Sequence, residues 1–248
     1  MSPDRIRLFV AGATGYTGQA VVRRARARGL EVVAHVRPDS PSLADWRARF
    51  EALGATVDTT PWDEDAMQDT LEHHRPTHLF ALLGTTRARA RRSEDAGERA
   101  DPYEAVDYGL TALLLRAAMA SAVEPAFVYL SALGADARSG NSYIAVRGRI
   151  ERELRNSGLR YLVVRPSFIT GGDRPERRRL ERIAARATDL AVRALGVVRL
   201  ARFGARLRSI DASTLAESMI DLALERGAEN RVVERDELPP HPIRALAR

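Results

Sequence analysis

Three glycines, three residues apart, follow an apolar run near the start of the chain and constrain its fold more than any other feature. Residues 6–11 predict a strand buried on both faces of a parallel sheet, and residues 17–29 predict an amphipathic helix that ends at a glycine. A glycine turn between such a strand and helix presents backbone N–H groups and the positive end of the helix dipole to the pyrophosphate of a dinucleotide. The sequence therefore predicts a dinucleotide site here, with an ordinary helix-start turn as the alternative. The residues expected to contact the dinucleotide are Gly12, Thr14, Gly15, Tyr16, Thr17 and Gly18.

The same alternation of strand and helix continues along the chain. Further strands are predicted at 30–36, 56–60, 77–83, 126–131, 161–166 and 231–234, and further helices at 42–53, 63–73, 103–120, 143–156 and 212–225. This order is typical of an α/β, Rossmann-type, doubly wound parallel sheet with helices on both faces. A length of 248 residues fits one domain over 1–248.

Two segments interrupt the alternation and are expected on the substrate side of the sheet, at about 87–102 and 167–210. The first is polar and rich in arginine and glutamate, which indicates a surface loop. In the second, residues 176–198 carry apolar side chains at helical spacing and predict an amphipathic helix in a small C-terminal region. This helix could pack over the sheet, lie on a membrane surface or cover a substrate.

Arg37 stands nineteen positions after Gly18, at the expected end of the second strand. A carboxylate near this position would bind the ribose 2′-hydroxyl of NAD, whereas a guanidinium can hold the 2′-phosphate of NADP. The sequence thus favours NADP. Asp39 keeps NAD open, and Arg37 could also be one more surface arginine.

Composition excludes several kinds of protein. The chain has no cysteine, so disulfides and thiolate metal sites are excluded. Pro76 separates His74 from His78, so the histidines offer no helical metal pair, and no metal site is expected. All 39 basic residues are arginine and the net charge is +6, but acidic residues are interleaved with them throughout, which argues against nucleic acid as a partner. Without a signal peptide or an apolar stretch of about 18 residues, we expect a cytoplasmic protein with no membrane span.

Several short motifs together resemble the atypical short-chain dehydrogenase/reductases, and within them the NAD(P)-binding NmrA-like and Tat-interacting-protein oxidoreductase-like group. They are GATGYTG, VVAHVRP, LLGTTR, YLSALGAD, the run from Tyr143 to Arg147 and VVRPSFITG, and the resemblance covers about residues 5–225. It implies that Asp63 contacts the adenine, that Gly84, Thr85 and Thr86 flank the ribose and phosphates, and that Pro166 and Phe168 border the nicotinamide. Asp63 could instead cap a helix, and Pro166 could simply end its strand.

The resemblance also implies an active site made of Ser131, Tyr143 and Arg147. In the family, the tyrosine hydroxyl transfers a proton as hydride moves, the serine holds the substrate oxygen, and a lysine lowers the tyrosine pKa and binds the ribose. Arg147 occupies the lysine position. An arginine supplies the charge but keeps its proton, so a proton relay through it is in doubt.

These features predict an NADPH-dependent oxidoreductase that reduces a carbonyl or similar small molecule. The alternative is a non-catalytic NAD(P)-sensing regulator that binds a protein partner. The sequence leaves open the identity of the substrate and whether the chain forms a homodimer.

Overall fold

The computed structural model describes residues 6–85, 101, 103–167, 169–170, 209–225, 227 and 229–238. The strands in this part of the chain are β1 (Arg7–Ala11), β2 (Glu31–His35), β3 (Thr56–Asp58), β4 (His78–Ala81), β5 (Ala126–Leu130), β6 (Tyr161–Arg165), β7 (Ile169–Thr170), β8 (Ile210–Asp211) and β9 (Arg231–Glu234). The helices are α1 (Tyr16–Ala27), α2 (Leu43–Ala52), α3 (Glu64–His74), the π-helix η1 (Tyr103–Leu110), α5 (Thr111–Ala120), α6 (Ser142–Asn156) and α9 (Ala212–Leu224).

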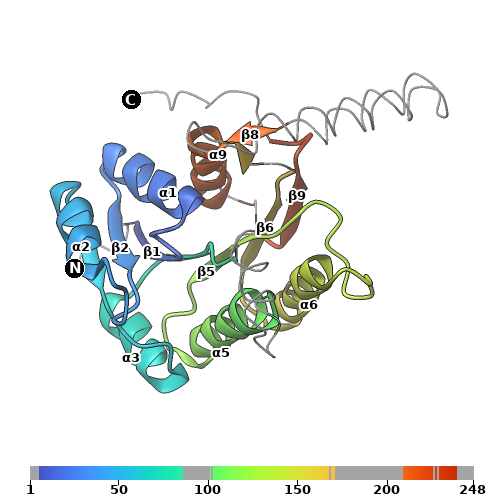
Figure 1. Cartoon of the computed structure of the whole chain (residues 1–248), viewed down its shortest axis with the longest axis horizontal. Helices are drawn as coiled ribbons and strands as arrows, with labels where there is room; N and C mark the ends of the chain where they lie inside the picture. The colour runs from blue at the N-terminus through green and yellow to red at the C-terminus, as the bar shows by residue number, and fades with distance from the viewer. Residues whose placement is uncertain are drawn as a thin grey trace.

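Seven parallel strands form one sheet in the order β3-β2-β1-β4-β5-β6-β9. The chain runs from β1 outward to β3, returns to pair β4 with β1, and continues to the opposite edge. This reversal is the switch point at which doubly wound sheets bind ligands, at the carboxyl ends of their strands. Helices lie on both sides of the sheet (Figure 1), so the structure confirms the predicted Rossmann-type α/β fold.

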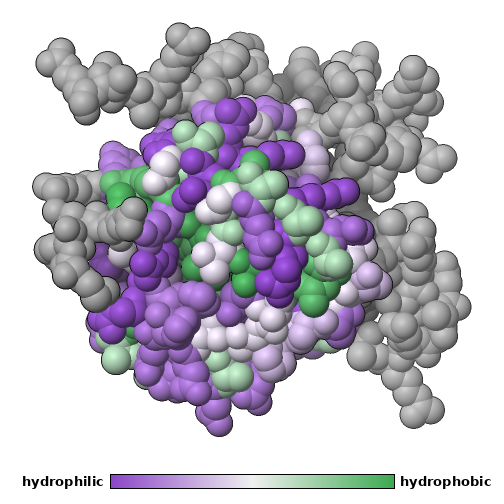
Figure 2. Space-filling model, turned by 90° about the vertical axis from the view of Figure 1, so that its left-hand side faces the viewer, coloured by the Kyte–Doolittle hydropathy of each residue, from purple (hydrophilic) through white to green (hydrophobic). Residues whose placement is uncertain are grey.

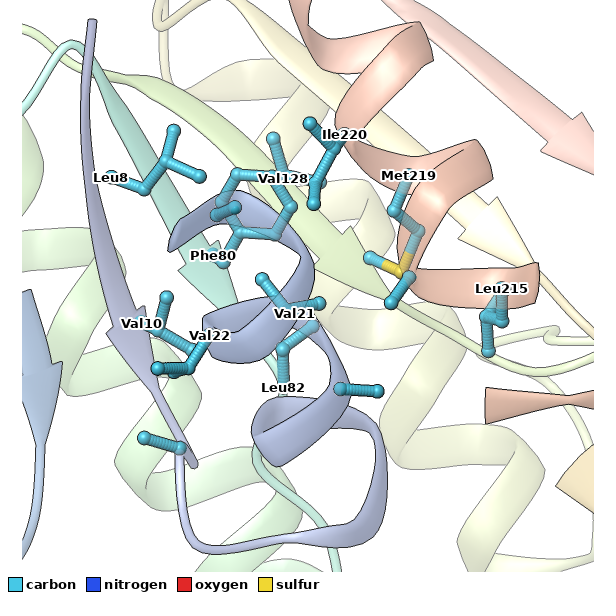
Figure 3. Packing of buried hydrophobic residues seen from close by; sticks show 14 of the residues in the cluster. Leu8, Val10, Val21, Val22, Phe80, Leu82, Val128, Leu215, Met219 and Ile220 are labelled. Atoms are coloured by element: carbon cyan, nitrogen blue, oxygen red, sulfur yellow. The ribbon is translucent and has the colours of Figure 1, made fainter. Parts of the chain in front are cut away.

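Side chains of β1 alternate between two hydrophobic cores, as expected for a central strand. Leu8 and Val10 face the core beneath α1 and α9, where they join Val21, Met219 and other residues that Figure 3 labels. Phe9 faces the opposite core, beneath α3, α5 and α6. Hydrophobic cores therefore cover both faces of the sheet, and a ligand would bind at the carboxyl ends of the strands.

The structure departs from the sequence prediction between β4 and β5. A single helix is predicted over 103–120, but residues 103–110 wind as the π-helix η1 before α5 begins at Thr111. Asp107 is the buried residue of η1. Wider helical turns of this kind are rare and often occur at functional sites.

Some predicted features lie outside the described residues. These are Thr86, Phe168, the helix at 176–198 and nearly all of the loop at 87–102. A short parallel pair, β7 with β8, comes before and after the segment that contains 176–198 in the sequence, and it is not predicted from the sequence.

The surface of the described part is mainly polar on the side that Figure 2 shows, where hydrophobic residues occupy smaller areas between hydrophilic ones. Among the described helices, none has the length and apolarity needed to cross a membrane. The described side chains also include no group of three or more carboxylates and histidines arranged to hold a metal ion.

Candidate functional site

The glycine turn between β1 and α1 is closed by a 3.0 Å hydrogen bond from the N–H of Gly15 to the carbonyl oxygen of Gly12. Gly12 has a φ of +83°, and a Cβ there would lie 2.7 Å from the carbonyl oxygen of Leu82, just after β4. A Cβ on Gly18 would overlap the Gly12 carbonyl oxygen and lie 2.8 Å from the Cα of Ala13. Both positions require glycine, because the turn packs directly on the neighbouring strand end and on α1.

The N-terminus of α1 has no side-chain cap, and Gly15 is its N-cap residue. Its first N–H groups therefore keep the capacity to bind an anion. The carbonyl oxygen of Thr14 accepts a 2.9 Å hydrogen bond from the side chain of Gln19, which fixes the middle of the turn. Tyr16 is exposed and Thr17 is buried, so the turn is open to solvent on one side and packed on the other.

Arg37 lies two residues beyond β2, and its side chain is 45% exposed. One terminal nitrogen is 3.3 Å from Oδ2 of Asp39, which is also exposed. A solvated pair of this kind contributes about 0–1 kcal/mol, so exchanging the carboxylate for a phosphate costs little. The guanidinium is thus available to a ligand at the carboxyl end of β2.

Two residues that the family resemblance implies have structural partners. Asp63 is the N-cap of α3, and its Oδ1 accepts from the backbone N–H of Ala66 at 3.0 Å. Pro166 directly follows β6 and is buried, and its carbonyl oxygen accepts from the N–H of Leu133 at 3.0 Å. The capping alternative for Asp63 is thus what the structure shows, and contacts of Asp63 and Pro166 with a cofactor stay predictions.

Arg147, on α6, lies behind the carboxyl ends of β4 and β5. Its side chain is 5% exposed and forms an ion pair with Asp107 of η1, which is fully buried. Its terminal nitrogens also donate to the carbonyl oxygens of Leu130, at 2.7 Å, and Leu83, at 3.2 Å. The guanidinium therefore bridges two strand ends, and only its Nε–H has no partner among the described residues.

Asp107 connects this ion pair to the loop after β4. Its second carboxylate oxygen accepts from the backbone N–H of Thr85 at 2.7 Å. A Cβ on Gly84 would lie 2.8 Å from a terminal nitrogen of Arg147, so the loop passes directly over the guanidinium. Burial raises the pKa of Asp107, and the charge of Arg147 offsets part of this shift. Burial likewise raises the pKa of the neighbouring Tyr129 to about 12.

Ser131 is held by a different carboxylate. Its hydroxyl donates to Oε1 of Glu151 at 2.6 Å, and the Glu151 side chain is 1% exposed. Arg165 donates to both oxygens of Glu151, at 2.8 and 2.6 Å, and Arg155 donates to Oε2 at 2.9 Å. Because a hydroxyl has one proton, Ser131 in this arrangement can accept a hydrogen bond from a ligand but has no proton left to donate.

Tyr143 is the second residue of α6 and is half-buried. Its ring packs edge-on against Tyr103, with 5.4 Å between ring centroids, and Cζ of Arg147 lies 5.3 Å from its ring centroid. Its hydroxyl has no hydrogen-bond partner in the described part of the chain. The structure thus brings Tyr143 and Arg147 together, one helical turn apart, and ties Ser131 to Glu151.

Sequence reasoning did not single out Asp107 or Glu151 as site residues. Asp107 could have been noticed as a lone carboxylate within the apolar stretch 105–115. Glu151 belongs to the run that begins at Tyr143, four positions beyond Arg147. Their roles become visible only when three separate segments of chain are placed around each carboxylate.

The chain was then compared with known proteins. A family model described as NAD(P)H-binding matches residues 12–197. Among solved structures, UDP-glucose 4-epimerase from Brucella ovis in complex with NAD is similar, with 17% identity, a TM-score of 0.62, and coverage of 92% of this chain and 76% of that one. NADPH-dependent quinone oxidoreductase from Escherichia coli, complexed with NADPH, gives 21% identity, a TM-score of 0.58, and coverage of 92% and 68%. Identities this low show a common fold.

Curated relatives include Protein FMP52-1, mitochondrial, from Scheffersomyces stipitis, which is 26% identical over 165 residues. The match covers 66% of this chain and 67% of the relative, so this chain aligns with about two thirds of that protein. All six curated relatives that match are named mitochondrial. This finding contradicts the expectation of a cytoplasmic protein. That expectation was based on the lack of an apolar leader or span, a criterion that does not separate cytoplasmic from mitochondrial proteins.

Proposed function

Because the chain belongs to the NAD(P)H-binding family, we propose that it is an NADPH-dependent oxidoreductase that reduces a carbonyl or similar small molecule. Within that family we assign it to the NmrA-like and Tat-interacting-protein oxidoreductase-like group, on the motifs LLGTTR and Tyr143 to Glu151. The observation that carries the proposal is the glycine turn. It leaves no room for a Cβ at Gly12 or Gly18, and it is followed by a helix N-terminus without a side-chain cap.

The residues present fit a dinucleotide at three points. The glycine turn offers backbone N–H groups to a pyrophosphate, and the exposed Arg37 offers a bidentate donor to a 2′-phosphate. In the candidate active site, the third point, Arg147 keeps one buried N–H without a partner among the described residues. A buried donor of this kind calls for a water or ligand acceptor, and a ribose hydroxyl would supply one.

The proposed chemistry needs a proton donor at the reacting oxygen, while the bound cofactor supplies the hydride. Tyr143 takes the role of donor, because its hydroxyl has no competing hydrogen bond in the described part of the chain. The positive charge of Arg147 stabilises the phenolate that forms when the proton leaves. Ser131, whose own proton is donated to Glu151, acts as an acceptor and orients a hydroxyl group of the substrate or product.

The hydrogen bond of Ser131 to Glu151 and the ion pair of Arg147 with Asp107 also favour a second candidate function, a non-catalytic sensor of NAD(P) that binds a protein partner. With Arg147 paired to Asp107 and Ser131 paired to Glu151, Tyr143 is the one of these three residues whose side chain can still exchange a proton with a substrate. A sensor would bind the dinucleotide without consuming it.

Parallel calorimetric titrations with NADPH, NADP, NADH and NAD test the cofactor proposal. We expect NADPH to bind at least about tenfold more tightly than NADH, which corresponds to about 1.4 kcal/mol. Arg37→Ala should remove this preference, whereas Arg47→Ala should keep it, because Arg47 is a surface arginine on α2 paired with Glu51. Equal affinities for all four dinucleotides in the wild-type protein would refute the assignment of Arg37.

A panel of carbonyl compounds and quinones, followed by NADPH absorbance, separates the enzyme from the sensor. An enzyme consumes NADPH with at least one member of the panel. Tight binding of NADPH with no consumption, together with a difference in affinity between the oxidised and reduced dinucleotides, would support the sensor instead.

A further inference from the structure

Four arginines line a cavity of about 230 Å³ between α6, the loop 135–138 and the end of β6. They are Arg138 from the loop, Arg152 and Arg155 from α6, and Arg165 from β6. The cavity is smaller than the roughly 300–1,000 Å³ typical of sites for drug-sized ligands, which restricts it to an ion or a small group.

The charges around this arginine-lined cavity are unbalanced. Two carboxylates, Asp136 and Glu151, line it together with the four arginines, and a third, Glu234, pairs with Arg165 at 3.4 Å, which leaves an excess of one positive charge. Both carboxylate oxygens of Glu151 already accept hydrogen bonds from Arg165, and Oε2 also accepts one from Arg155. The guanidinium groups of Arg138 and Arg152 form no ion pair with any residue that the structure describes, although both face the cavity.

The walls of the cavity are fixed by close contacts. The loop crosses α6 at Gly148, where a Cβ would lie 2.7 Å from the Cα of Asp136. The carbonyl oxygen of Ala135 accepts from Arg165 at 3.1 Å, and the N–H of Ser139 donates to the carbonyl oxygen of Asp136 at 3.0 Å. The arginines therefore project from a scaffold that holds its shape without a ligand.

We propose that this cavity binds a phosphate group, either free or carried by a small phosphorylated molecule. Planar guanidinium groups bind phosphate oxygens bidentately, and the excess of positive charge favours an anion. Arg138 and Arg152 supply the principal contacts, since they have no partner to give up. This site is separate from the glycine turn, and it does not depend on the proposed cofactor.

The cavity shares one group with the candidate active site. Glu151 lines the cavity and also accepts the hydroxyl proton of Ser131. A phosphate that draws Arg155 toward itself removes one donor from Glu151 and strengthens the hold of this carboxylate on Ser131. Occupancy of the cavity and the position of Ser131 are thereby coupled through a single side chain.

Calorimetric titration with inorganic phosphate, glycerol 3-phosphate and malonate tests the proposal on three proteins. They are the wild type, Arg138→Ala/Arg152→Ala, and the control Arg116→Ala/Arg160→Ala. Both variants lose two positive charges, so their general attraction for anions is equal. Arg116 pairs with Glu64 on α3, and Arg160 precedes β6 at the end opposite Arg165. Circular dichroism and urea unfolding check that each variant is folded.

We expect the cavity variant to bind phosphate at least about tenfold more weakly than the control, which should match the wild type. Tighter binding of glycerol 3-phosphate than of inorganic phosphate would identify a phosphorylated molecule as the ligand, and the reverse order would identify free phosphate. Equal phosphate affinity in the two variants, or no measurable binding to the wild type, would overturn the proposal. Malonate binding as tight as phosphate would overturn the assignment to phosphate.

Discussion

Replacement of Arg147 by methionine tests whether the buried ion pair with Asp107 holds the strand ends together. Methionine keeps much of the side-chain volume but leaves the carboxylate of Asp107 buried with one backbone donor, the N–H of Thr85. Removing one partner of a buried pair costs about 3–5 kcal/mol. The lost hydrogen bonds to Leu83 and Leu130 add about 1 kcal/mol each. A loss of this size is a large part of the roughly 5–15 kcal/mol that stabilises a typical domain.

The assay is urea unfolding of the wild type, Arg147→Met, Asp107→Asn and the double variant at about pH 7.5 and about pH 5. Burial raises the pKa of Asp107, so its ionised form is disfavoured in the fold, and this cost disappears as pH falls through the folded-state pKa. Loss of Arg147 raises this pKa further, so the deficit of Arg147→Met should shrink at the lower pH. The free energy of unfolding that the double variant loses should be smaller than the sum of the losses in the two single variants by at least about 1 kcal/mol.

Two results would refute this reasoning about the ion pair. The first is a cost of less than about 1 kcal/mol for Arg147→Met at the higher pH, where a buried, unpaired carboxylate should be most unfavourable. The second is strict additivity of the Arg147 and Asp107 substitutions. Either result would mean that the strand ends are held by packing alone.

Three further predictions concern the turn, the buried histidines and the proposed proton donor. Gly18→Ala should abolish dinucleotide binding and cost about 1–3 kcal/mol of stability by thermal melting, whereas Gly140→Ala, with open space around it, should do neither. Burial lowers the pKa of His35 and of His78, so the stability they contribute is full above the ordinary value of about 6.5 and is lost as pH falls below it. Between about pH 7 and about pH 5, the free energy of unfolding should therefore decrease less in a variant with both histidines replaced by glutamine than in the wild type. An equal decrease in the two proteins would contradict the assignment of this pH dependence to His35 and His78. Tyr143→Phe should lower NADPH consumption at least about 100-fold while NADPH affinity and melting temperature stay unchanged; retained turnover would exclude Tyr143 as the donor.

The order of strands and helices could be predicted because it depends on local patterns. The alternation of Leu8, Phe9 and Val10 between two cores follows from an apolar strand, and the glycine turn follows from its place after that strand. The π-helix could not be predicted, since its winding brings the buried Asp107 against Arg147, which is distant in sequence.

The candidate site was predicted in part, for a related reason. The family resemblance implied Tyr143 and Arg147, and the structure places them one helical turn apart. The partner of Ser131 depends on how β5, α6 and β6 meet. Only in the folded chain do the Ser131 hydroxyl and Arg165 both donate to Glu151, and a motif does not say in which direction a hydroxyl donates.

In the active site that we propose, Arg147 separates two tasks that a lysine would combine. Its charge lies 5.3 Å from the Tyr143 ring centroid, so the electrostatic support for a phenolate is retained. Its terminal nitrogens are occupied by Asp107 and by the carbonyl oxygens of Leu83 and Leu130, and with respect to the described residues only Nε–H is left to bind a ribose hydroxyl. A guanidinium also keeps its proton at any working pH, so no proton passes through it to Tyr143. In the enzyme that we propose, Tyr143 must therefore recover its proton directly from solvent. Its half-buried position at the start of α6, and a hydroxyl that has no hydrogen-bond partner among the residues described, are compatible with that route, which places the proton pathway at the carboxyl ends of the strands and not on the buried side of Arg147.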